Sequence, residues 1–149
     1  MAHTGDRKNF LVALPLAYLV ALLPGCGGGG GSGTALLSVG GTYQTEVTLL
    51  PGNTCGNVVV QNNPTTVTHT PGAGTLSIQH VGINASGTID RTAHFSTDPT
   101  TVSTFTVTIT GQLNVRGLDA TVTLTQAQPA CQYMVHWVGT KDGAPNTIP

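Results

Sequence analysis

Apolar residues alternate strictly with threonines in two long segments of this chain. Residues 104–110 and 120–125 place an apolar residue at every second position and threonine between, the apolar set being Phe105, Val107, Ile109, Ala120, Val122 and Leu124. Successive side chains of a β-strand point to opposite faces of a sheet. This period therefore predicts strands with one buried and one polar face, as in an antiparallel sheet covered on one side.

The same period-two pattern continues through most of the chain after residue 41, and no segment there follows the helical period. Glycine, proline and asparagine mark turns between the strands at a spacing of about 8–12 residues, which is typical of a β-sandwich or a β-barrel. We therefore expect an all-β fold. The candidate strands are residues 42–50, 56–61, 65–70, 75–81, 85–90, 93–97, 101–111, 118–126 and 131–138.

The alternation also predicts which side chains are buried. A shift of one residue would bury the threonines and expose the apolar set, and each unpaired buried hydroxyl costs about 1–3 kcal/mol. We expect the core to contain Tyr43, Val47, Leu76, Ile78, Phe105, Val107, Ile109, Val122, Leu124, Tyr133, Val135 and Trp137. We expect water to face Thr104, Thr106, Thr108, Thr121, Thr123 and Thr125.

The N-terminal residues have the layout of a secretory signal peptide. Arg7 and Lys8 precede an apolar run from Phe10 to Leu23, which at about 14 residues is shorter than the roughly 20 that a spanning helix needs. The run ends in Leu23-Pro24-Gly25-Cys26, which resembles the lipobox of bacterial lipoproteins. This resemblance implies that residues 1–25 are removed, that the Cys26 thiol is acylated, and that the protein is exported and anchored to a membrane through lipid.

The residues after Cys26 predict a tether and then one domain. Residues 27–33 are glycine and serine only, a composition typical of flexible linkers. Residues 34–149 are long enough for a single hydrophobic core, so we expect one all-β domain there. In Gram-negative lipoproteins an aspartate after the lipidated cysteine commonly favours the inner membrane. Gly27 occupies that position here, so the resemblance implies the outer membrane if the host has one.

The other two cysteines predict a disulfide. Cys55 and Cys131 remain once Cys26 carries lipid, and an even pair in an exported chain favours a bridge. In a closed meander with an even number of strands, the last strand pairs with the first, which brings Cys131 beside Cys55. Nine strands would place them at opposite ends. We therefore expect a small antiparallel meander barrel of about eight strands, with 56–61 or 93–97 not a separate strand; the alternative is a β-sandwich.

Few residues suggest chemistry at a catalytic or metal site. Charged residues make up 7% of the chain and form no basic patch, which argues against nucleic acid as a partner. Of the histidines, His69 and His80 are the better candidates for a metal ligand pair, but we expect no metal, because a zinc site needs three or four convergent ligands. Most of the carboxylates lie next to turns, no thiol is free and no Gly-x-Ser-x-Gly motif occurs, so we expect neither catalysis nor a cofactor.

Two kinds of function agree with these features. We expect a lipid-anchored envelope protein whose β domain has a non-catalytic structural or surface-interaction role. The alternative is a binder of a small apolar ligand or a metal, with Tyr133 and Trp137 lining a cavity, since small barrels can hold one small molecule. A filled core with one flat threonine face would favour the first, and an internal cavity would favour the second. The sequence alone does not identify a ligand or a partner protein.

Overall fold

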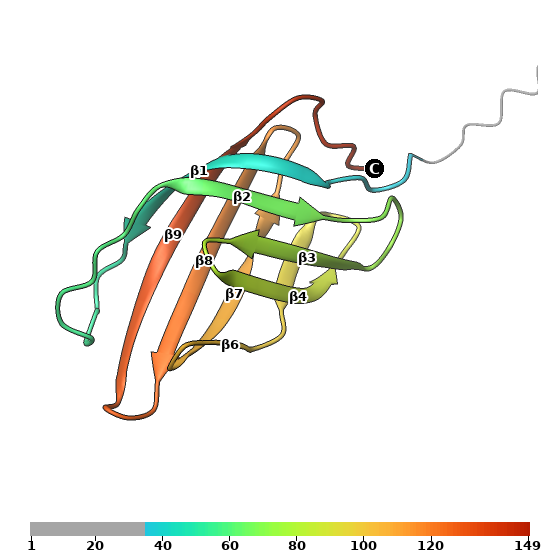
Figure 1. Cartoon of the computed structure of the whole chain (residues 1–149). Coiled ribbons are helices and arrows are strands. Elements are labelled where there is room, and N and C mark those ends of the chain that lie inside the picture. Colours follow the sequence, from blue (N-terminus) through green and yellow to red (C-terminus); the bar gives the residue numbers. More distant parts are fainter. Residues whose placement is uncertain (1–34) are drawn as a thin grey trace, which may run out of the picture. The chain divides into compact units, whose positions relative to one another are not determined.

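The computed structural model describes residues 35–149, and this part of the chain folds into strands without a helix (Figure 1). None of the described residues belongs to a helix that is long and apolar enough to cross a membrane. The predicted signal peptide, Cys26 and the tether lie outside the described residues. The strands are β1 (Gly41–Leu49), β2 (Asn63–Thr68), β3 (Thr75–His80), β4 (Ile83–Ile89), β5 (His94–Thr97), β6 (Thr100–Val102), β7 (Phe105–Leu113), β8 (Gly117–Gln126) and β9 (Cys131–Lys141).

These strands form a closed antiparallel barrel of eight strands with one extra strand. Neighbours in sequence pair from β1 to β5 and again from β6 to β9. Two further pairings close the sheet, one between β9 and β1 and one between β5 and β7. The extra strand, β6, pairs with β7. The predicted meander barrel is therefore confirmed, and the fold is not the alternative β-sandwich.

Strands β5 and β6 lie one after the other along β7, which explains how nine strands fill eight positions. His94 of β5 pairs with Gln112, and Thr100 of β6 pairs with Val107. Between them stands Pro99, which has no N–H to contribute to a ladder. The single strand predicted at 101–111 is wrong, because the chain reverses at Ser103, whose φ of 56° is left-handed. The predicted strand at 93–97 is present as β5.

The predicted strand at 56–61 is wrong, and this segment belongs to the long loop between β1 and β2. Its three consecutive valines favour extended structure, but β1 already pairs with β2 on one edge and with β9 on the other. The ladder with β2 ends at Thr45, and beyond it the Val47 N–H donates to the Asn62 side chain and not to a strand, so tertiary context overrides β-propensity. Of the two segments that the cysteine argument singled out, this is the one that is not a strand.

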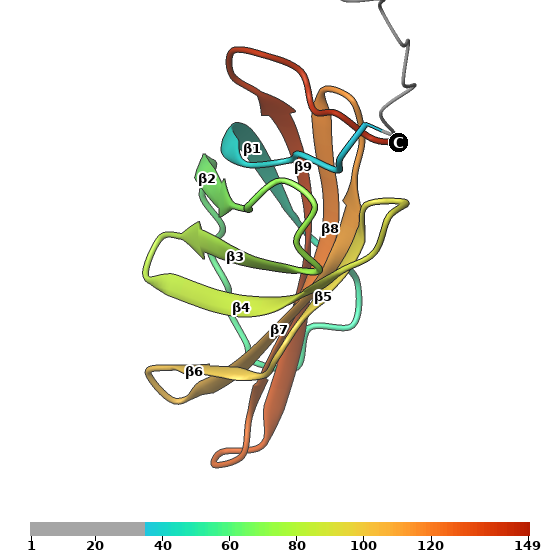
Figure 2. The same ribbon diagram turned by 90° about the vertical axis from the view of Figure 1, so that its right-hand side faces the viewer.

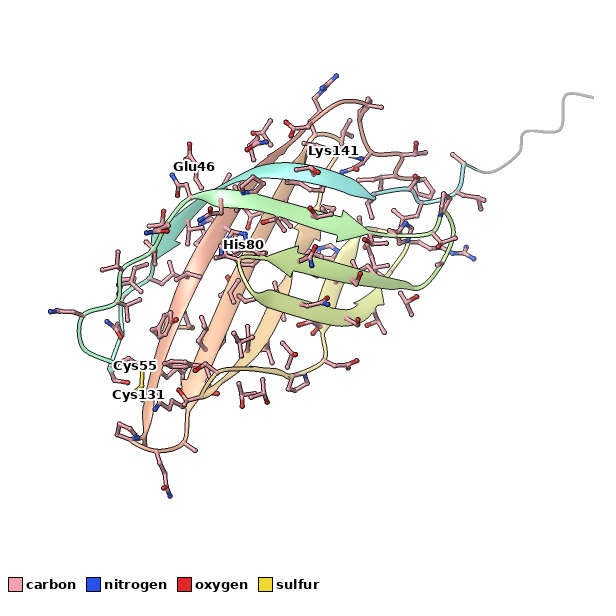
Figure 3. The ribbon with its side chains drawn as sticks, viewed as in Figure 1. Glu46, Cys55, His80, Cys131 and Lys141 are labelled. Carbon is pink, nitrogen blue, oxygen red and sulfur yellow. A yellow bond between two sulfur atoms is a disulfide. The ribbon has the colours of Figure 1, made fainter. Side chains whose placement is uncertain are left out.

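The disulfide between Cys55 and Cys131 is confirmed, with 4.9 Å between the two Cα atoms. Pairing between the first and last strands continues past the end of β1, because the Leu50 N–H donates to Met134 O and the Thr54 N–H to Gln132 O, both at 2.9 Å. Figure 3 shows the bridge beside the turn that joins β8 and β9. The bond therefore fastens the seam where the barrel closes.

The predicted core is confirmed. All twelve residues are buried or packed against the buried cluster, with Tyr43, Ile78, Val107, Ile109 and Val122 fully enclosed. The six predicted threonines are exposed or half-buried on the outer face of β7 and β8 and in the turn before β7. The core also contains residues outside that predicted set, which include Leu37, Val39, Val67, Phe95, Leu113 and Leu118.

One end of the barrel is closed by the segment that precedes β1 and the segment that follows β9. Leu37 and Val39, which precede β1, are buried. Ser38 forms an antiparallel bridge with Thr147, which follows β9. Asn146 donates from its Nδ2 atom to Asn114 O at 2.6 Å and from its backbone N–H to Val115 O at 2.8 Å. Figure 2 shows the C-terminus beside the segment that enters β1, at this closed end.

The seam disulfide should contribute strongly to stability. It closes a span of 76 residues, for which the chain-entropy estimate is about 4–5 kcal/mol. A Cys55→Ser/Cys131→Ser variant should therefore unfold at a clearly lower denaturant concentration than the wild type, with an unchanged β-sheet circular dichroism spectrum before unfolding. Reductant should lower the midpoint of the wild type and leave that of the variant unchanged. Equal midpoints for oxidised and reduced wild type would contradict the seam role.

Candidate ligand-binding site

The end of the barrel opposite the closed end is open because its strands differ in length. Strands β8 and β9 have 10 and 11 residues, whereas β2 and β3 have six each. The long strands continue past the ends of the short ones, as Figure 1 shows. Inward-facing side chains near those ends, such as Leu124 and Tyr133, therefore have no strand across from them.

The loop between β1 and β2 covers part of this open end. Val58 and Val60 of the loop are half-buried and stand across from the inner faces of β8 and β9. A hollow of about 250 Å³ remains between them. Its wall is largely apolar, and no charged side chain lines it; the lining includes Val47, Val58, Val122, Leu124, Tyr133 and Trp137.

His80 brings a polar group into this apolar hollow from the end of β3. Its side chain is 6% exposed and its ring lies beside the Trp137 indole, with 4.2 Å between ring centroids. Its Nδ1 atom is 2.9 Å from the Thr65 hydroxyl oxygen. Burial lowers the pKa of His80 below its ordinary value of 6.5. The ring is therefore neutral at neutral pH.

A chain of buried hydroxyls continues from His80 into the barrel. The Thr65 and Thr45 hydroxyl oxygens are 2.8 Å apart. The Thr45 hydroxyl is also 3.1 Å from the backbone oxygen of Tyr43. Both threonines are buried, at 0% and 4% exposed. Each hydroxyl in this row therefore has a hydrogen-bond partner, which offsets the cost of removing it from water.

The predicted cavity residues lie where the sequence argument placed them, at the wall of one cavity. Tyr133 and Trp137 both line the hollow. Burial raises the pKa of Tyr133 above 10.0, and its ring meets Phe105 edge-on with centroids 5.5 Å apart. Sequence reasoning missed the loop valines, because three valines in a row also predict a strand. It could not have found the hollow itself, which depends on unequal strand lengths across the barrel.

The structure does not bring the two candidate metal ligands together. Extending the pairing of β2 with β3 sets His69 opposite Leu76 and His80 opposite Thr65. The histidines are thus four positions apart along the ladder, roughly 13 Å at the usual strand rise. His69 bonds instead to Ala73 O at 3.0 Å. Within residues 35–149, no group of three or more His, Cys, Asp and Glu side chains is arranged to hold a metal ion.

The other histidines and carboxylates lie outside the hollow, on the surface. His136 contacts Asp119 at 3.0 Å on the outer face of β8 and β9. Asp90 accepts hydrogen bonds from the Thr92 hydroxyl and from the backbone N–H groups of Thr92 and His94. These bonds, that from the Thr92 hydroxyl first, hold the pKa of Asp90 below 3.8. Asp90 therefore stabilises the turn between β4 and β5.

A second hollow, of about 460 Å³, lies at the closed end. Ala35, Leu36 and the turn between β2 and β3 contribute to its wall. The buried side chains of Leu37 and Val39 belong to the core at this same end. This hollow borders the part of the chain that the structure does not describe, so the better-defined site is the one at the open end.

Comparisons with family models, with curated proteins and with solved structures found no match to this chain. The residues of the barrel itself therefore provide the information about function. The most specific arrangement among them is the apolar hollow with His80 in its wall.

Acidification should weaken the fold through His80. Its pKa is lower in the folded state than the 6.5 of the unfolded chain, so below that pH the unfolded chain takes up the proton more readily. The free energy of unfolding of the wild type should therefore fall as the pH drops below about 6.5. A His80→Gln variant should lose less stability over the same range. Urea unfolding at several pH values checks this, and identical slopes for both proteins would contradict it.

Proposed function

We propose that this protein is an exported, lipid-anchored envelope protein whose barrel is non-catalytic and binds a small apolar ligand at its open end. The observation that carries the proposal is the apolar hollow of about 250 Å³ between the long strands and the loop. Pockets for drug-sized ligands usually measure roughly 300–1,000 Å³. The ligand is therefore smaller than a typical drug.

Exposed apolar side chains at the rim of the hollow support this proposal. Val59 in the loop is 83% exposed and Val81 in the turn between β3 and β4 is 64% exposed. Val81 also has a φ of 31°, a left-handed conformation that is unfavourable for a β-branched residue. Asparagine before glycine is the favoured pair in such a two-residue hairpin. An apolar side chain is thus kept at the rim despite backbone strain and exposure to water.

The anchor proposal agrees with the position of the open end. The tether would connect the lipidated Cys26 to the barrel at Ala35, which lies at the closed end. The hollow is at the other end of the strands. A ligand can then enter without passing the point where the anchor segment joins. In a host with an outer membrane, we place the protein there.

A second candidate function has its own supporting observation. Threonines form cross-strand pairs on the outer face of β7 and β8, at Thr106–Thr125, Thr108–Thr123 and Thr110–Thr121. This face is polar without being charged and has a regular spacing. It fits the structural or surface-interaction role that the sequence alone suggests. The hollow is the more specific feature, because its wall combines apolar side chains with one buried histidine.

Lipid on Cys26 should be detectable in the host. Metabolic labelling with a fatty acid should mark the wild type and place it in the membrane fraction. The Cys26→Ala variant should carry no label, because it lacks the thiol that is acylated, while a Cys55→Ser/Cys131→Ser variant should still be labelled. An unlabelled wild type in the soluble fraction would rule out the anchor.

Binding of naphthalene, a small apolar probe, should report on the hollow. Trp137 is the only tryptophan in the chain, so its indole N–H gives a single NMR signal that should shift on titration. Val81→Asn should weaken binding by removing an apolar contact, and it should also stabilise the fold by relieving the turn. Val115→Asn is the matched control, because Val115 is 56% exposed at the closed end. An unmoved Trp137 signal, or equal weakening by both variants, would contradict the binding site.

A further inference from the structure

We propose that the hollow selects a small neutral alcohol or phenol, with the ligand hydroxyl bonded to the Nε2 atom of His80. This inference rests on the ligand-binding function proposed above and names the chemical class of its ligand. It follows from the contacts of His80, from the direction of the buried hydroxyl chain, and from the lack of charge in the wall.

His80 has one ring nitrogen without a protein partner. Its Nδ1 atom contacts the Thr65 hydroxyl, and no hydrogen bond within residues 35–149 reaches Nε2. Across that same part of the chain, the only sealed side-chain polar atom without a partner is Nδ1 of His69. The Nε2 atom of His80 is therefore not sealed inside protein. The open space that His80 lines is the hollow, so a ligand there can reach this atom.

The buried hydroxyl chain allows Nε2 to act either as a donor or as an acceptor. Each threonine hydroxyl has one proton to donate. If Thr45 donates to Thr65, then Thr65 donates to Nδ1 of His80 and the Nε2–H group points to the ligand. If Thr45 donates instead to Tyr43 O, then Thr65 donates to Thr45, the Nδ1–H group donates to Thr65, and Nε2 accepts. The first arrangement uses the Thr45–Thr65 and Thr65–His80 contacts, and the second also uses the contact of Thr45 with Tyr43 O.

A hydroxyl is the ligand group that suits both arrangements. It can accept from Nε2–H or donate to Nε2, whereas a carboxylate can only accept and an ammonium can only donate. A charged group would also enter a wall without charged side chains, where no counterion offsets its desolvation. The rest of the wall is largely apolar, with Gln61, Asn63 and Tyr133 as its other polar residues, and the volume is about 250 Å³. These features together select one hydroxyl on a small apolar body.

The experiment compares naphthalene with 2-naphthol, which adds one hydroxyl to the same ring system. Titrations at neutral pH follow the Trp137 indole N–H signal in the wild type, in His80→Phe and in Tyr133→Phe. The wild type should bind 2-naphthol about two- to tenfold more tightly than naphthalene, the range for one hydrogen bond to a buried group. His80→Phe should bind both equally. Tyr133→Phe, which removes the hydroxyl of a second ring that lines the hollow, should keep the preference.

Each result separates the inference from the function on which it rests. Equal affinities in the wild type, or a preference that persists in His80→Phe, would overturn the hydroxyl assignment and leave apolar binding in place. Failure of both compounds to bind would overturn the proposed function itself. The ¹⁵N shift of His80 Nε2 in the wild type provides a readout without a variant. It should change with 2-naphthol and stay constant with naphthalene, and the reverse result would contradict the proposal.

Discussion

Pairing between the first and last strands is the constraint on which the rest of this structure depends. It runs from Tyr43 opposite Lys141 to Leu49 opposite Val135. An antiparallel sheet can close in this way only if an even number of strands surrounds the barrel, and β5 and β6 meet that requirement by sharing one position along β7. Closure removes the free edges that an open sheet would expose. It also brings Cys55 beside Cys131, so the disulfide is a consequence of the topology as well as a support for it.

Closure together with unequal strand lengths gives the barrel two different ends. At one end the segments before β1 and after β9 contribute Leu37, Val39 and Asn146 to the buried interior. At the other end β8 and β9 extend beyond the ends of the short strands, and only a loop covers their inner side chains. A loop covers a surface less completely than a paired strand, so a hollow remains there. The location of the proposed site is therefore set by strand length, and its chemistry is set by the residues that happen to face inward, above all His80.

Period-two alternation was enough to predict the all-β class, the buried face and the outward threonines, because burial on one face of a strand is encoded locally. The cysteine argument predicted the closed, even-stranded barrel, since one covalent link excludes many topologies. Local sequence could not predict that Val58–Val60 form a loop, because their β-propensity is high and only the tertiary fold leaves them without a strand partner. It also could not reveal the hollow, which depends on the relative lengths of strands distant in sequence. The sequence singled out His80 as a candidate metal ligand, but its contact with Thr65 could not be predicted, because it depends on the register of β2 against β3. The lipid anchor stays a prediction.

The central claim is that the sheet closes between β1 and β9, since the core, the disulfide and the open end all follow from it. Cross-strand nuclear Overhauser effects in the folded, oxidised protein test this claim most directly. Closure predicts backbone contacts along the whole seam, from Gln44 with Thr140 through Thr48 with His136, and also between Phe95 and Gly111 at the second closing pair. A set of contacts that joins neighbouring strands but is missing at these two places would contradict the account, because the sheet would then be open.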